Sequence, residues 1–307
     1  MLEIRQHLVN ILIKSAIEAL RILRIHKFFP KEPAVRSIVS SALLKPEKRR
    51  LCVFASYSPT DKVPEFVYYY LQQLRDLDFD IIFASTSDSL SQAALEELQT
   101  MCFRVILREN IGYDFGSWKA GLFYAGVDLN HYDLLLLAND SCYAPLFPLT
   151  NLLKRQDFDI SAMTDSYEGK HHLMSYFVIY SRKVFLSPVF ESIWTDVRML
   201  PKKLKGLIVA VYEVGMSSQF RNAGVKLEAF FPAENILKAT NLMQRKHKIN
   251  PVHLLWKELI EIENFPMLKV DLFKRQFRKN NDNSWRDVIQ QTQYPIELII
   301  QHQEEGL

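Results

Sequence analysis

The sequence has 307 residues, of which 48% are hydrophobic and 24% charged, proportions that are typical of a globular protein and exclude a disordered or fibrous chain. That length suits one large α/β domain, with or without a helical appendage. The net charge of +3 combines +7 on residues 1–50 with −4 on the remainder, and a mildly acidic body makes a nucleic-acid partner unexpected.

Residues 2–26 have the periodicity of an amphipathic helix, which Pro30 and Pro33 bring to an end. Two interpretations stay open: a helix packed on the core or on a partner subunit, and an interfacial helix on anionic lipid. The sequence contains no run of 18 apolar residues and no signal-peptide pattern. We therefore expect residues 1–49 to form an N-terminal helix and linker, with peripheral membrane contact through residues 1–30.

The next part of the chain alternates between short apolar runs and helical patterns. The runs predict strands at 50–56, 79–85, 103–107 and 132–138, and the patterns predict helices at 63–77, 92–101 and 115–125. Such alternation is typical of βαβ units and a parallel sheet. Three cysteines, Cys52, Cys102 and Cys142, lie in or beside these runs without any CxxC pair, so we expect reduced thiols in a cytoplasmic protein.

The pattern is less regular after residue 150. We predict strands at 160–164, 175–181 and 226–231, a helix at 213–223, and helix throughout from Pro251. The predicted architecture is a Rossmann-type, mostly parallel α/β sheet flanked by helices. It comprises a domain at 50–245, preceded by the N-terminal helix and followed by a helical extension at 246–307.

Four polar loops follow the first four predicted strands: residues 56–60, 86–88, 108–116 and 139–145. Ligands of parallel α/β sheets bind beyond the carboxyl ends of the strands, so these loops predict a shared crevice. Ser56 belongs to the first loop, and Asp88 of the second is a candidate contact for a base or ribose.

The loop at 108–116 has features of a nucleotide site. Its two glycines allow close approach of the backbone to a ligand, and the following helix N-terminus favours phosphate. Arg108 is a candidate phosphate ligand, Asn110 and Asp114 are candidate ligands of sugar hydroxyls, and Gly112 shapes the pocket. The alternative is a plain strand–helix turn with Gly112 as its left-handed residue.

A very apolar strand leads into Asn139, Asp140 and Ser141. A carboxylate at that place suits a divalent cation, Mg²⁺ or Mn²⁺, that bridges a diphosphate, and this makes Asp140 the candidate metal ligand. Asn139 and Ser141 are candidates for direct contact with the donor. The alternative is a common Asx-turn.

Glu213 opens the predicted helix at 213–223. An acid at a helix start is commonly a residue that interacts with the helix dipole. The alternative is a general base that deprotonates an acceptor hydroxyl. The sequence leaves both possibilities open.

These motifs together resemble known families. The order of strand, ENIG loop, helix, apolar strand and NDS resembles an inverting glycosyltransferase of the GT-A type, and residues 213–224 resemble the acidic motif of family 2 glycosyltransferases. Over roughly residues 50–280 the chain resembles the rhamnan synthesis protein F family. The matching stretches are 108–119 (RENIGYDFGSWK), 138–141 (ANDS), 172–177 (HLMSYF), 250–256 (NPVHLLW) and 265–270 (FPMLKV).

The resemblance implies a bacterial transferase with a GT-A-like fold that moves rhamnose from dTDP-rhamnose to a growing cell-surface polysaccharide. The basic N-terminal helix suggests attachment near a lipid-linked saccharide acceptor at the inner face of the cell membrane. The resemblance also implies Glu213 as the catalytic base and His172, Ser175 and Tyr176 on the acceptor side, with a structural hydrogen bond or a metal as the alternatives for His172. Two departures matter: the metal motif has one carboxylate, and Glu213 has no adjacent acid. They motivate an alternative function, a non-catalytic sugar-nucleotide or polysaccharide-binding subunit.

Overall fold

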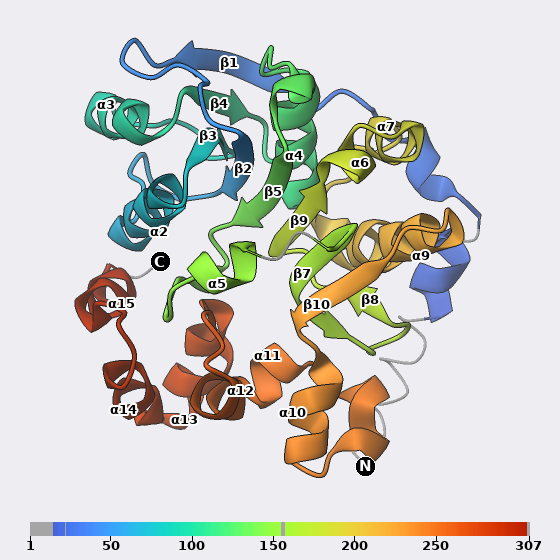
Figure 1. Cartoon of the computed structure of the whole chain (residues 1–307), viewed down its shortest axis with the longest axis vertical. Helices are drawn as coiled ribbons and strands as arrows, with labels where there is room; N and C mark the ends of the chain where they lie inside the picture. The colour runs from blue at the N-terminus through green and yellow to red at the C-terminus, as the bar shows by residue number, and fades with distance from the viewer. Residues whose placement is uncertain (1–14, 22, 155–156, 306–307) are drawn as a thin grey trace.

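A mixed sheet forms the centre of the computed structural model, which describes residues 15–21, 23–154 and 157–305 (Figure 1). Within these residues nine strands pair in the order β1-β4-β3-β2-β5-β9-β7-β10, with β8 added on β7. The strands are β1 (Val35–Ser40), β2 (Arg50–Ser56), β3 (Phe79–Ser85), β4 (Arg104–Arg108), β5 (Leu134–Asn139), β7 (Ile160–Ser166), β8 (His172–Leu173), β9 (Phe177–Ser181) and β10 (Leu227–Phe231).

The four central strands β4, β3, β2 and β5 are all parallel. The chain passes from β2 to β3 to β4 on one side of β2 and then places β5 on the other side. This reversal of strand order makes the carboxyl ends of β2 and β5 the topological switch point, where ligands of such sheets bind. The prediction of a mostly parallel sheet is confirmed, and strands β2 and β3 have the predicted bounds.

Helices cover both faces of the sheet. One core contains Cys52 and Phe54 together with α2 (Glu65–Asp76) and α3 (Gln92–Met101). Alternate residues of the same strand, such as Val53, enter a second core with α4 (Tyr113–Phe123), α7 (Pro188–Thr195) and α9 (Gly215–Asn222). Side chains of a strand point alternately to the two faces, so a strand that is apolar at every position is buried on both.

The N-terminal segment adds a strand that the sequence analysis missed. Residues 1–14, which carry most of the predicted N-terminal helix, lie outside the described residues; residues 15–21 are helical, and Leu20 packs against the second core. A short 3₁₀ turn, η1 (Ile25–Phe28), precedes β1, which pairs antiparallel with β4. The expected boundary at residue 49 therefore falls between two strands of one sheet.

The C-terminal segment, residues 232–305, is not all helix, although helix throughout was predicted from Pro251. Its helices are α10 (Ala233–Ala239), α11 (Pro251–Leu254), α12 (Trp256–Glu263), α13 (Arg278–Asn280), α14 (Ser284–Gln290) and α15 (Ile296–Glu304). Between them β11 (Leu268–Lys269) pairs antiparallel with β6 (Cys142–Tyr143), which begins three residues after β5 ends. Figure 1 shows the helices α12 to α15 gathered beside α2, against which α15 packs.

The buried ring of Tyr143 joins this C-terminal segment to the sheet. Its hydroxyl lies 2.6 Å from His302 Nδ1 and accepts a hydrogen bond of 2.6 Å from Gln303 Nε2. The remaining short elements are α5 (Thr150–Leu153), α6 (Arg182–Phe185), α8 (Lys205–Ile208), the 3₁₀ turns η2 (Leu129–His131), η3 (Lys202–Leu204) and η5 (Met243–Lys248), and the π-helical turns η4 (Val209–Val214) and η6 (Phe273–Phe277). Among the described helices, none has the length and apolar character needed to span a membrane.

Candidate functional site

A cavity of about 1130 Å³ opens at the carboxyl ends of β2 and β5. Its walls come from the loops after these strands, the start of α4, the turn η4, the C-terminal segment around β11, the helical residues 17–21 and the turn between β7 and β8. The cavity therefore lies at the switch point that the strand order defines. Of the predicted site residues, it is lined by Asp114, Asn139, Asp140, Ser141, His172, Ser175, Tyr176 and Glu213.

Asp140 links the ends of β2 and β5. Its Oδ2 accepts hydrogen bonds of 2.8 Å each from Ser56 Oγ and from the Tyr57 backbone N–H. Burial raises the pKa of Asp140 to about 7, and the negative charge of Asp114 adds to the rise. Ser56 thus forms a hydrogen bond with Asp140 and does not itself line the cavity.

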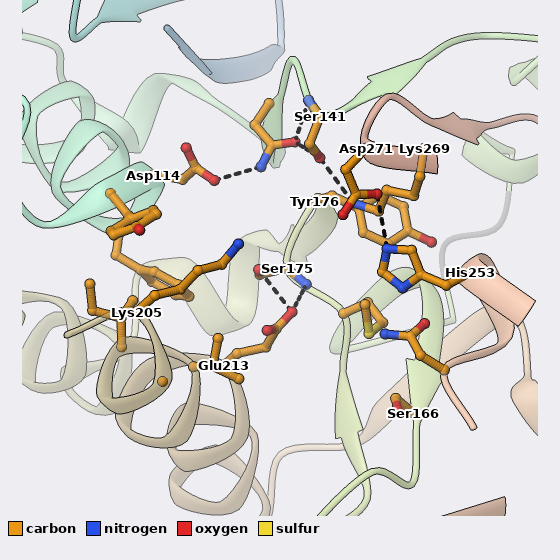
Figure 2. A pocket seen from close by; sticks show the side chains of 18 of the residues that line it. Asp114, Ser141, Ser166, Ser175, Tyr176, Lys205, Glu213, His253, Lys269 and Asp271 are labelled. Atoms are coloured by element: carbon orange, nitrogen blue, oxygen red, sulfur yellow. Dashed lines mark hydrogen bonds and ion pairs between the residues drawn. The ribbon is translucent and has the colours of Figure 1, made fainter. Parts of the chain in front are cut away.

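Asp114 supplies a second carboxylate from the first turn of α4. Asn139 Nδ2 donates to Asp114 Oδ2 at 2.7 Å, and Asn139 Oδ1 accepts from the hydroxyl of Ser141 at 2.6 Å (Figure 2). Burial also raises the pKa of Asp114. The sequence motif offered one acid, and the fold brings a second one to it.

The number of acidic side chains at the site limits how a metal ion could be bound there. In the described part of the chain, no group of three or more His, Cys, Asp or Glu side chains could hold a metal ion. Mg²⁺ is commonly bound by one or two carboxylates, with substrate phosphates and water completing its coordination. Asp114 and Asp140 are two carboxylates of the cavity lining, and this number fits an ion shared with a bound diphosphate rather than an ion that the protein holds alone.

Glu213 stands on the opposite wall of the cavity (Figure 2). It lies in the π-helical turn η4 between α8 and α9, so the expectation that it opens a helix is wrong. Its Oε1 accepts hydrogen bonds from the Ser175 backbone N–H at 2.8 Å and the Ser175 hydroxyl at 3.0 Å. Single π-helical turns frequently occur at functional sites, and this one aims a carboxylate into the cavity.

His172 and Tyr176, the other two residues expected on the acceptor side, form hydrogen bonds within the protein. His172 is buried, and its Nδ1 lies 2.7 Å from the Lys170 carbonyl oxygen, a structural hydrogen bond. The hydroxyl of Tyr176 bonds Thr164 Oγ1 at 2.6 Å. Tyr176 therefore contributes mainly its ring to the cavity.

Arg108 is not in the cavity, and the expected phosphate contact is wrong. The side chain is fully buried, and it donates to the Pro33 carbonyl at 2.9 Å, to Ser117 Oγ at 3.2 Å and to the Ile111 carbonyl. Burial lowers the pKa of Arg108 to about 10. The reason is topological: β4 lies two strands away from the switch point, next to the edge strand β1.

Three further predicted donor contacts also lie outside the cavity lining: Asp88, Asn110 and Gly112. Asp88 is exposed after β3, and its carbonyl accepts from Arg36 Nη1 at 2.5 Å. Gly112 has a φ of 78° and donates its N–H to the Leu200 carbonyl at 2.7 Å. Gly112 is therefore the left-handed residue of a strand–helix turn, the alternative that the sequence left open.

Replacing Arg108 by methionine is expected to lower stability without affecting ligand binding. The variant leaves the carbonyls of Pro33 and Ile111 without their buried donor, at an expected cost of about 2–4 kcal/mol in the free energy of unfolding. Urea unfolding measures this loss, with the exposed Arg245→Met as the control. If Arg108→Met has normal stability and binds nucleotides poorly, a phosphate-binding role of Arg108 would be supported after all.

The raised pKa of Asp140 predicts a pH dependence of stability. Its ordinary value is 3.8 and its folded value about 7, so between these values the folded state holds a proton that the unfolded state has lost. The free energy of unfolding therefore falls as pH rises through this interval, by on the order of a few kcal/mol. Asp140→Asn lacks this titration and gains stability relative to the wild type between pH 4 and pH 8.

The measurement is urea unfolding in EDTA at pH 4 and at pH 8, with Asp88→Asn as the exposed control. A stability difference between Asp140→Asn and the wild type that is the same at both pH values would contradict the prediction.

The C-terminal segment supplies cavity residues that the sequence analysis did not single out. They include His253, Lys269 and Asp271. His253 Nε2 and Arg275 Nε lie 3.0 and 2.9 Å from the carboxylate of Asp271. His253 and Lys269 lie within the quoted stretches 250–256 and 265–270, but no spacing connected those stretches to Asp140.

Comparison with protein families finds a match to the model described as rhamnan synthesis protein F over residues 81–306. The match extends to residue 306, beyond the expected end near residue 280, and it begins after β2. Virulence protein VirA of Vibrio anguillarum is 26% identical over 251 residues, which cover 74% of this chain and 80% of VirA. Uncharacterized protein y4gN of Sinorhizobium fredii is 26% identical over 215 residues, which cover 68% and 55%.

Solved structures give a looser likeness. A putative nucleotide-diphospho-sugar transferase from Desulfovibrio desulfuricans aligns with 15% identity and a TM-score of 0.36, covering 71% of this chain and 98% of its own. The glycosyltransferase GlyE of Streptococcus pneumoniae aligns with 14% identity and a TM-score of 0.38, covering 73% and 54%.

Proposed function

Because the chain belongs to the rhamnan synthesis protein F family, we propose that it is a glycosyltransferase that uses a nucleotide-sugar donor. One observation carries the proposal: the cavity at the switch point is lined by two neighbouring acids, Asp114 and Asp140, and Glu213 stands across the cavity from Asp114. A donor diphosphate and an acceptor hydroxyl require such separate groups on the two sides of the transferred sugar.

The donor side is formed by the residues after β5. Asn139 and Ser141 contact the donor, and Asp114 and Asp140 would hold Mg²⁺ or Mn²⁺ on the diphosphate. When bound, such an ion neutralises charge on the departing nucleoside diphosphate. The family description, rhamnan synthesis, makes dTDP-rhamnose the donor that we propose.

Glu213 is the proposed general base of an inverting transfer. Its carboxylate takes the proton of the acceptor hydroxyl while that oxygen forms a bond to the anomeric carbon. The bond between this carbon and the diphosphate oxygen breaks, and its electron pair leaves with the nucleoside diphosphate. Ser175 fixes the orientation of Glu213 through both of its hydrogen bonds.

The proposed acceptor is a lipid-linked saccharide at the inner face of the cell membrane, with residues 1–30 making peripheral contact. The basic charge of the N-terminal segment supports this proposal. A chain lacking residues 1–30 is then expected to lose sedimentation with anionic liposomes that the full chain shows. Equal sedimentation of both chains would reject the membrane contact.

Thermal unfolding with a panel of UDP-, dTDP- and GDP-sugars tests the function, with MnCl₂ and with EDTA. A ligand at about 100 times its Kd adds about 2.7 kcal/mol to the free energy of unfolding, which raises the Tm by several degrees. Donor turnover is then measured with the sugar that stabilises most. Stabilisation without hydrolysis or transfer would support the non-catalytic alternative, and the absence of stabilisation by any sugar nucleotide would contradict both.

A further inference from the structure

Lys269 reaches the switch point from the C-terminal segment. In the pairing of β11 with β6 it lies opposite Cys142, and the next residue, Val270, donates its N–H to the Ser141 carbonyl at 3.0 Å. Backbone pairing on both sides therefore fixes the base of this side chain beside the end of β5. The ladder brings Lys269, which lies 129 positions after Asp140 in the chain, next to Ser141, the neighbour of Asp140.

The ammonium group of Lys269 is held in one place by two contacts. Nζ donates to Ser141 Oγ at 2.9 Å, and it lies 3.9 Å from the centroid of the Tyr176 ring (Figure 2). A cation over an aromatic ring is attracted by the ring electrons, and these contacts limit the freedom of the long side chain. Its position is therefore organised before any ligand arrives.

In the described part of the chain, the positive charge of Lys269 favours the ionised forms of Asp114, Asp271 and Cys142, but it forms no ion pair. No carboxylate there forms an ion pair with it, and the nearby Asp271 pairs with His253 and Arg275 instead. An ammonium group has three N–H donors, and Ser141 takes one of them while the Tyr176 ring covers one side. Because no carboxylate is ion-paired with Lys269, its ammonium group can still form a charge-assisted hydrogen bond with a ligand in the cavity.

The neighbouring acids explain why a cation is needed here. Asp114 and Asp140 both face the cavity, and they would repel a diphosphate. The positive charge of Lys269 already opposes the rise that burial causes in the pKa of Asp114. Lys205 and Lys274 also line the cavity, but both side chains are exposed and no hydrogen bond of either is present among the described residues.

We propose that Lys269 binds the diphosphate of the nucleotide-sugar donor and stabilises the charge of the nucleoside diphosphate as it leaves. This inference rests on the proposed function. During the transfer the bond between the anomeric carbon and the diphosphate oxygen breaks, and its electron pair stays on that oxygen. The proton of the acceptor hydroxyl goes to Glu213, and Lys269 transfers no proton in this step. The C-terminal segment is then part of the donor site.

Isothermal titration tests the assignment with UDP, dTDP and GDP and with the three corresponding free nucleosides, in EDTA and in MnCl₂. Lys269→Met is expected to bind the preferred diphosphate about 10- to 100-fold more weakly than the wild type, because a charge-assisted hydrogen bond is lost. Nucleoside affinity stays unchanged. Lys269→Arg keeps most of the affinity, and Lys274→Met, a second lysine of the same cavity, behaves as the wild type.

The outcomes separate the two proposals. If the wild type binds a diphosphate and Lys269→Met binds it equally well, the role of Lys269 is overturned while the proposed function stands. If Lys269→Met loses diphosphate and nucleoside affinity by the same factor, the residue supports the fold and does not contact phosphate. If the wild type binds none of the diphosphates in either buffer, the proposed function itself fails, and the inference fails with it. Thermal unfolding of each variant confirms that it is folded.

Discussion

Replacing Glu213 by glutamine is expected to lower the rate of sugar transfer by about 10²–10⁴-fold while donor affinity stays within about twofold of the wild type. Glutamine has the same shape and keeps an oxygen that accepts from the Ser175 N–H, so the wall of the cavity is preserved. It lacks a carboxylate that can take a proton from the acceptor hydroxyl. Initial rates of transfer and donor titrations on the same preparation measure the two quantities.

Two further variants make this test specific. Glu47→Gln changes an exposed acid outside the cavity and is expected to transfer sugar at the wild-type rate. Ser175→Ala removes one of the two hydrogen bonds that orient Glu213, so its rate falls less than that of Glu213→Gln. Near-normal turnover of Glu213→Gln would remove Glu213 from the role of base.

Replacing Ile299 by aspartate is expected to destabilise the whole chain strongly, with the sheet and the C-terminal helices unfolding together. Ile299 is fully buried in α15. This helix packs against α2, which covers one face of the central sheet. The variant buries a charge without a partner and removes apolar contacts, at an expected cost of at least about 4–5 kcal/mol. That loss is a large part of the 5–15 kcal/mol that typically stabilises a protein. Thermal unfolding followed by circular dichroism measures the loss.

The matched control is Ile262→Asp in α12. Ile262 is 57% exposed, so an aspartate there stays in water and stability is expected to change by about 0.5 kcal/mol or less. If Ile299→Asp instead melts in two steps and the sheet unfolds at the wild-type temperature, the C-terminal helices form a separate cooperative unit. A separate C-terminal extension that begins near residue 246 would then be supported.

The walls of the cavity show how the two parts of the chain depend on each other. The sheet half supplies Asp140 and Glu213, and the C-terminal segment supplies Lys269 and Asp271. The antiparallel pair of β11 and β6 joins them, together with the Tyr143 contacts to α15. Loss of α15 packing is therefore expected to impair the donor side of the cavity as well as the stability of the protein.

Local patterns in the sequence were sufficient for the elements around residues 50–139. Fully apolar runs such as Arg50–Ser56 and Phe79–Ser85 fit strands buried on both faces, and the intervening periodicity fits helices. The same reasoning placed Asp140 beyond a strand end. It missed β1 because Val35–Ser40 is a largely exposed edge strand without an apolar run, and it missed β11 because two residues carry no periodicity.

The sequence by itself therefore determined a mostly parallel α/β sheet and the strand ends that line the cavity, because both depend on hydrophobic patterns between near neighbours. The tertiary structure alone decided which of those ends meet. The strand order turned Arg108 into a buried structural residue and brought Asp114 beside Asp140. The β11–β6 ladder carried Lys269 to Ser141. These pairings join residues far apart in the chain, and the backbone hydrogen bonds and packing that create them have no local signature in the sequence.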